Sequence, residues 1–164
     1  MRVIGVDPGQ TGAIASWDGS SLIVFDVPTL TVAKSSGKGK RTEVNLPELV
    51  DNLNILFAGS DHAYIERVGA MPGQGVTSTF NFGMAYGYLR MGIAMIGVPS
   101  TLVAPVKWKS ELGLSNDGEK SRHRALELFP KFSSYFSRKM DHNRAEAALL
   151  AYYGRQMLTV GKVR

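Results

Sequence analysis

Two acidic residues stand where buried strands should end. Asp7 follows the apolar residues 3–6 and precedes a Pro-Gly turn, and Glu66 follows residues 62–65. A carboxylate at a strand's exit can simply accept hydrogen bonds from the next turn, and Arg67 offers Glu66 an ion pair. Because consecutive strand residues point to opposite faces, the pairing of Glu66 with Arg67 would be poor. The alternative is that the two acids share a cation.

The apolar spacing predicts the elements that must bring these acids together. We predict strands over residues 2–6, 13–17, 21–27, 62–66 and 100–104, and helices over 46–57, 77–96, 105–112, 119–129 and 143–158. Short turns make the first three strands antiparallel, whereas a helix before the fourth strand makes it parallel to the first. Asp7 and Glu66 then lie side by side, about 4.8 Å apart. Carboxylates at that spacing repel unless they share a proton or a cation, and a hard divalent ion such as Mg²⁺ satisfies both.

A third source of ligands is the segment D-H-N-R-A-E at residues 141–146. His142 and Glu146 lie four residues apart, which places them on one face of a helix, and Asp141 directly precedes them. Neighbouring alanines would let this helix sit close to the sheet. The alternative is a capping box, in which Asn143 is the N-cap and Glu146 binds back to its backbone. The local pattern fits both interpretations.

Composition and charge limit the class of protein. The chain has 164 residues, 44% of them hydrophobic, which is enough for one core, so we expect a single domain over residues 1–164. It has no cysteine, which excludes disulfides, thiolate metal sites and cysteine nucleophiles. No apolar run is long enough to span a membrane, and we expect a soluble, cytoplasmic protein with no membrane partner. A net charge of +5 favours a polyanionic partner such as nucleic acid.

Four motifs occur in an order that resembles a known family. They are V-x-G-V-D-P-G at residues 3–9, Y-I-E-R-V at 64–68, A-P-V-K-W-K at 104–109 and D-H-N-R-A-E-A at 141–147, with a glycine-containing helix after the second. This order resembles RuvC-type Holliday junction resolvases, especially their short phage members. The resemblance implies an α/β, ribonuclease H-like fold with a five-stranded mixed sheet flanked by helices. It also implies a homodimer that cuts four-way junctions or other branched DNA by Mg²⁺-dependent paired nicking, in the host cytoplasm if phage-encoded.

The resemblance also implies catalytic roles for the acids. Asp7 and Glu66 match the metal ligands of the first two motifs, and Glu146 takes the place of the family's final helical aspartate. For the fourth ligand, the family's position falls on Asn143, helical geometry favours His142, and charge favours Asp141. Our order of preference is His142, Asp141, Asn143. Two Mg²⁺ ions per site, replaceable by Mn²⁺, would activate a water for in-line attack on the phosphodiester.

Basic residues are candidates for DNA contacts. We expect four of them to hold phosphates near the site: Lys107, Lys109, Lys120 and Arg122. Four more are expected to grip a distant arm from a mobile, glycine- and serine-rich loop: Lys34, Lys38, Lys40 and Arg41. The bacterial family opens the junction with an aromatic wedge shortly after its second glutamate. Here Met71 is the only large apolar candidate, and loop packing is its alternative role. Trp108 is predicted to be a core or packing residue, and stacking on an unpaired base is its alternative role.

The glycine-containing helix has two apolar faces. The first stripe is Phe80, Gly83, Met84, Gly87, Met91 and Met95, and the second is Phe82, Tyr86, Leu89 and Ile93. A single sheet cannot cover both stripes. The helix is therefore either buried on all sides or packs its first stripe against a second copy of the chain.

Two other functions fit part of the sequence. The turn D-P-G-Q-T-G at residues 7–12 is also similar to the first phosphate turn of actin-like and sugar-kinase ATPases, although these need two lobes. A non-catalytic branched-DNA-binding protein of the same fold would keep the basic patches and have a broken acidic cluster.

Overall fold

A five-stranded mixed sheet forms the centre of the computed structural model, which describes residues 1–34, 38–70 and 73–161. Its strand order is β3-β2-β1-β6-β7, and the bounds are β1 Val3–Asp7, β2 Ala13–Trp17, β3 Leu22–Asp26, β6 His62–Glu66 and β7 Ser100–Val103. Strands β1, β2 and β3 are antiparallel neighbours, while β6 and β7 run parallel to β1. The predicted sheet, with β6 parallel to β1, is confirmed.

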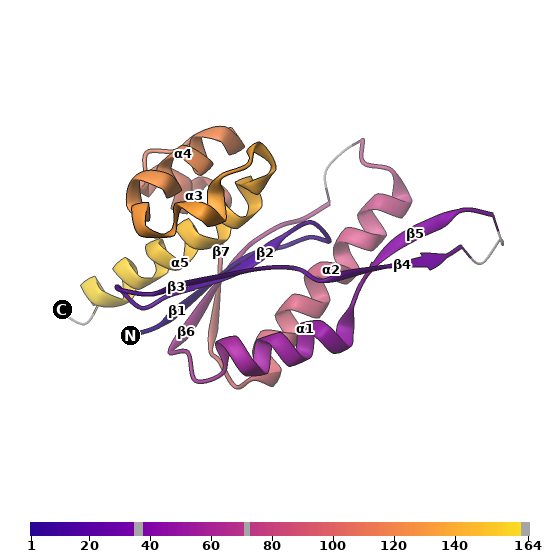
Figure 1. The fold of residues 1–164 in the computed structure, drawn as a ribbon, viewed down its shortest axis with the longest axis horizontal. Helices are drawn as coiled ribbons and strands as arrows, with labels where there is room; N and C mark the ends of the chain where they lie inside the picture. Colours follow the sequence, from indigo (N-terminus) through magenta and orange to yellow (C-terminus); the bar gives the residue numbers. More distant parts are fainter. Residues whose placement is uncertain (35–37, 71–72, 162–164) are drawn as a thin grey trace.

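Helices cover both faces of this sheet (Figure 1). One face carries α5 (His142–Gly161), with α3 (Pro105–Glu111) and α4 (Gly118–Leu128) beside it, and the other carries α1 (Leu46–Asn52) and α2 (Val76–Met95). Short 3₁₀ segments, Pro130–Phe136 and Lys139–Asp141, lead into α5. Each face has its own buried apolar core, because successive strand residues alternate between the two faces.

Two predicted elements differ from the structure. The helix expected over residues 46–57 is α-helical only to Asn52 and continues as a π-helix over Leu53–Phe57. The segment expected to be a loop, residues 34–41, overlaps a β-hairpin formed by β4 (Thr29–Ala33) and β5 (Lys40–Val44). The loop prediction was wrong for Lys40 and Arg41, which lie in β5. Most of the hairpin's side chains are exposed; Thr29–Ala33 alternates polar and apolar residues as a strand does, whereas Lys40–Val44 is mostly polar.

Helix α2 buries one face and exposes the other. Leu89 and Ile93 are fully buried against the sheet, whereas Phe80, Met91 and Met95 are 64%, 62% and 68% exposed. The alternative of a helix buried on all sides is therefore wrong. The exposed residues belong to the stripe predicted to pack against a second copy. Within the described residues, no helix is both long and apolar enough to cross a membrane.

Candidate metal centre

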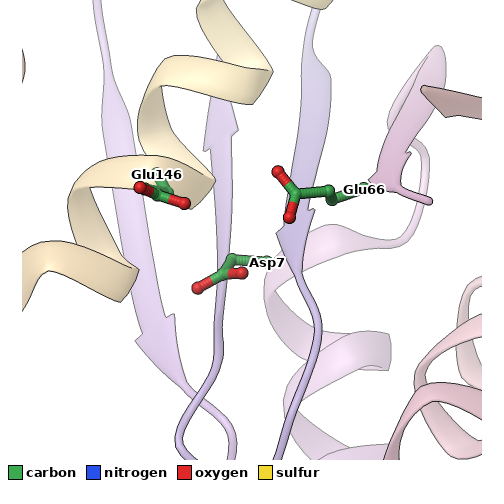
Figure 2. A group of neighbouring side chains, drawn as sticks. All are labelled: Asp7, Glu66 and Glu146. Atoms are coloured by element: carbon green, nitrogen blue, oxygen red, sulfur yellow. The ribbon is translucent and has the colours of Figure 1, made fainter. Parts of the chain in front are cut away.

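Three carboxylates from three elements converge at one end of the sheet (Figure 2). Asp7 ends β1, Glu66 ends β6, and Glu146 lies in the second turn of α5. One oxygen from each lies within 4.8 Å of the others. The structure thus brings together the three acids that the sequence predicted, including the pair on neighbouring parallel strands.

Strand alternation and one glycine explain this convergence. Val3 packs into the core on the α5 side, so Gly5 and Asp7 also face α5, as does Glu66 two residues after Tyr64. A Cβ on Gly5 would collide with the backbone carbonyl of Ala147. The absence of a side chain at this position lets α5 cross directly over β1. Glu146, one residue before Ala147, therefore meets the end of the strand.

Side chains of helices α3 and α4 orient Glu66 and Glu146. The indole Nε1 of Trp108 donates a hydrogen bond to Glu66 Oε2 at 2.8 Å. Lys109 Nζ and Ser121 Oγ both donate to Glu146 Oε1, each at 2.9 Å. One oxygen of each glutamate is thus fixed by a donor from outside the sheet. The predicted packing role of Trp108 fits its complete burial, but its hydrogen bond to Glu66 was not foreseen.

Lys109, one of the predicted phosphate contacts, is buried beside the carboxylates. It is 7% exposed, and its ammonium forms an ion pair with Glu146 inside the carboxylate cluster. The side chain points inward from α3 to Glu146, and its phosphate contact stays a prediction. Its positive charge offsets part of the repulsion among the three acids.

The electrostatics of the cluster favour a bound cation. Burial raises the pKa of Asp7 well above its usual range, and the negative charges of Glu146 and Glu66 raise it further, while Lys109 opposes the shift. Burial also raises the pKa of Glu66, against the hydrogen bond from Trp108. When ionised, the three carboxylates therefore repel one another at these distances. A divalent cation with oxygen ligands would relieve this repulsion.

The predicted fourth ligands lie elsewhere. Asp141 is buried, and its two oxygens accept hydrogen bonds from the backbone N–H and guanidinium of Arg138 at 2.7–2.9 Å. His142 is exposed and packs beside Gly118. Among the described residues, neither belongs to the group of carboxylates that could hold a metal. The preference for these two residues is not supported by their positions.

Asn143 lies closer to the acids than our order of preference implied. It lines the same hollow as Asp7, and its Nδ2 donates to the carbonyl of Thr11 at 2.6 Å. The capping box is absent, because Asn143 lies inside α5 and Glu146 binds Lys109 and Ser121 instead. The position matched by the family pattern is thus the one beside the cluster, with a neutral amide in place of an acid.

The other predicted DNA contacts occupy several surfaces. Lys107 and Lys120 are exposed on α3 and α4, whereas Arg122 is tied to Glu119 at 2.8 Å and to the carbonyl of Phe136 at 3.0 Å. The remaining four cations are exposed on the β4–β5 hairpin: Lys34, Lys38, Lys40 and Arg41. Met71 lies outside the described residues.

Comparison with known proteins identifies the fold. No family model and no curated protein matches the chain. Among solved structures, it is similar to Thermus thermophilus RuvC in complex with a Holliday junction substrate, with a TM-score of 0.58 and 12% identity over 96% of each chain. A second Thermus thermophilus RuvC structure gives a TM-score of 0.54 and 13% identity, over 97% of this chain and 98% of that one. The chain therefore has the ribonuclease H-like fold of RuvC, as predicted.

Proposed function

We propose that this protein is a metal-dependent, structure-selective endodeoxyribonuclease that resolves Holliday junctions or other branched DNA by paired nicking. The observation that carries the proposal is the convergence of Asp7, Glu66 and Glu146 within 4.8 Å, on a fold shared with RuvC. The structural neighbour was solved with a Holliday junction substrate, which supports the choice of substrate class. We place its action in the cytoplasm, that of the host cell if the protein is phage-encoded.

The donor set fits Mg²⁺. Three carboxylates supply the hard oxygen ligands that Mg²⁺ and Mn²⁺ prefer, and we propose that Asp7, Glu66 and Glu146 hold two such ions. The ions supply Lewis-acid stabilisation of the charge that develops on the phosphate and leaving oxygen. The protein's own groups prepare the site beforehand. Trp108 fixes Glu66 and Ser121 fixes Glu146, so that the oxygens need little rearrangement when the substrate arrives.

Surface residues would position the DNA. The exposed ammonium groups of Lys107 and Lys120 are available to phosphates, whereas Arg122 is held by Glu119. We propose that the exposed stripe of α2 packs against the same stripe of a second copy. A twofold axis there would present two carboxylate clusters to the two strands of a symmetric junction.

The rival functions have less support. A non-catalytic binding protein predicts a broken acidic cluster, and here the three acids converge with their positioning donors in place. An actin-like ATPase needs two lobes to enclose the nucleotide, whereas this chain is similar to RuvC over 96% of its length.

Cleavage of synthetic four-way, flap and linear DNA in Mg²⁺ tests the proposal. We expect the wild-type protein to nick the branched substrates, and Glu66→Gln to bind them without cutting. Glu127→Gln, on the exposed outer face of α4, is the matched control and should cut like the wild type. Cleavage by Glu66→Gln at the wild-type rate, or cleavage that persists in EDTA, would rule out the metal-centre mechanism.

A further inference from the structure

The β4–β5 hairpin stands apart from the rest of the fold. Its two strands pair with each other and, among the described strands, with no other. Figure 1 shows the hairpin extending outward past the end of the central sheet, alongside the N-terminal part of α2. An isolated two-stranded hairpin is marginally stable in water at best. Most side chains of β4 and β5 are exposed, so the hairpin offers a free surface to a partner.

The root of the hairpin is fixed beside the carboxylate cluster. Gln10, three residues after Asp7, donates a hydrogen bond from Nε2 to the carbonyl of Thr42 in β5 at 3.1 Å. Asn45 N donates to the carbonyl of Pro28 at 2.8 Å and closes the base of the hairpin. The hairpin thus leaves the protein at the end of the sheet where the acids lie.

A trough connects the acids with the hairpin. Asp7 lines one hollow together with Gln10 and Asn81. Gln10 and Asn81 also line a second hollow, which lies between the hairpin and α2 and includes Arg41 and Tyr88. Because the two hollows share Gln10 and Asn81, they form one trough, whose walls are both polar and apolar. A strand held at the carboxylates could continue along this trough to the hairpin.

The free end of the hairpin is strongly basic. Lys34, Lys38 and Lys40 are exposed there, and Arg41 is the next residue of β5. Glu43 is the only acid between residues 28 and 45, and it is already paired with Arg41 at 2.6 Å. Lys40 is four residues from the root at Val44, which places its backbone about 13 Å beyond the root. At 3.4 Å per nucleotide, this distance corresponds to about four base pairs of duplex.

We propose that the β4–β5 hairpin clamps the phosphate backbone of a duplex arm that continues from the strand held at the carboxylates, about four base pairs beyond the hairpin's root. The inference rests on the proposed function, since the carboxylates must hold the cut strand. Charge complementarity selects DNA as the partner. A second copy of this chain, with its net charge of +5, would be a poor partner for a basic hairpin.

The test measures binding without cleavage, in a Glu66→Gln background. The clamp variant carries Lys38→Gln and Lys40→Gln. The control variant carries Arg124→Gln and Lys131→Gln, which remove the same charge from residues that do not line the trough. We expect the slope of log K against log salt to fall by about 1.8 for the clamp variant and to stay unchanged for the control. Equal melting temperatures of the variants verify that the fold is intact.

Methylphosphonate scanning locates the contact. In the parent protein, a neutral methylphosphonate at one position of the duplex arm, about four base pairs or more from the cut position, should weaken binding, and it should have no further effect in the clamp variant. An unchanged salt slope, or no phosphate that couples to the two lysines, overturns the clamp. A change of molecular mass in light scattering with an unchanged slope also overturns it and assigns the hairpin to a contact between copies. A parent protein that binds no branched DNA refutes the proposed function itself.

Discussion

Replacing Asp7 with asparagine should stabilise the metal-free protein while abolishing its response to metal. When ionised, Asp7 carries one of three negative charges confined to a small space, and its pKa is raised well above the usual range by burial and by Glu146 and Glu66. Asparagine has nearly the same shape and no charge. The substitution therefore removes repulsion between Asp7 and the other two carboxylates.

The magnitude follows from the geometry. Two unit charges 4.8 Å apart repel by about 3.5 kcal/mol at an effective dielectric constant of about 20. Asp7→Asn removes two such repulsions and also the opposing attraction of Lys109. The net gain in stability is therefore close to the energy of one charge pair. The three acids are only partly buried, so solvent screening reduces this gain to about 1–2 kcal/mol. For a chain of this size, that gain raises the melting temperature by about 3–6 °C.

Thermal unfolding in EDTA, followed by titration with Mg²⁺, measures both effects. We expect Asp7→Asn to melt above the wild type in EDTA and to show no further increase with Mg²⁺, whereas the wild type gains stability as metal binds. Asp51→Asn, exposed on α1, is the matched control and should change neither value. A variant that melts at or below the wild type in EDTA would refute the idea that charge repulsion dominates the cluster.

Two further predictions concern the carboxylate cluster, and a third concerns the exposed face of α2. The raised pKa of Asp7 means that the folded protein binds the proton of this carboxyl more tightly than the unfolded protein does. In EDTA, the wild type therefore loses stability as the pH rises through that raised pKa. The melting-temperature difference between Asp7→Asn and wild type should vanish at low pH and grow with rising pH. Lys109→Met should lower metal-free stability and tighten Mn²⁺ binding by about tenfold or more in electron paramagnetic resonance titrations, and weaker binding would show that the lysine supports the site only structurally. Gly87→Leu should fold, since a Cβ there meets nothing within 4 Å among the described residues, yet light scattering should report a monomer that no longer makes paired cuts. Wild-type protein that is monomeric while cutting junctions in pairs would contradict that last prediction.

The sequence predicts the central sheet because its signals are local. Turns of a few residues force β1, β2 and β3 into antiparallel hairpins, and the helical segment before β6 requires a parallel crossover. Side-chain alternation then turns Asp7 and Glu66 toward the same face. The predicted pair of neighbouring carboxylates follows from these rules alone, before any contact between distant elements is known.

Other features depend on contacts that no local pattern contains. The spacing of Asp141 and His142 from Glu146 fitted a shared metal site. In the structure, however, the guanidinium of Arg138, three residues earlier, donates two hydrogen bonds to the carboxylate of Asp141. Although Thr29–Ala33 alternates polar and apolar residues, the β4–β5 hairpin was missed because β5 is mostly polar and follows a segment rich in lysine, serine and glycine, which is typical of loops. In both cases the structure depends on a contact, Arg138 with Asp141 or β4 with β5, that the local sequence pattern does not reveal.

The two lysines of α3, Lys107 and Lys109, show what helical periodicity can predict and what it cannot. Residues two apart on a helix point about 200° away from each other, so Lys107 and Lys109 could not both face DNA once residues 105–111 form a helix. Helical geometry alone therefore argues against the expectation that both hold phosphates. It does not reveal that the inward lysine meets Glu146, 37 residues later. That contact exists because α5 crosses β1 at Gly5, where a side chain of any size would push Glu146 away from the acids on the sheet.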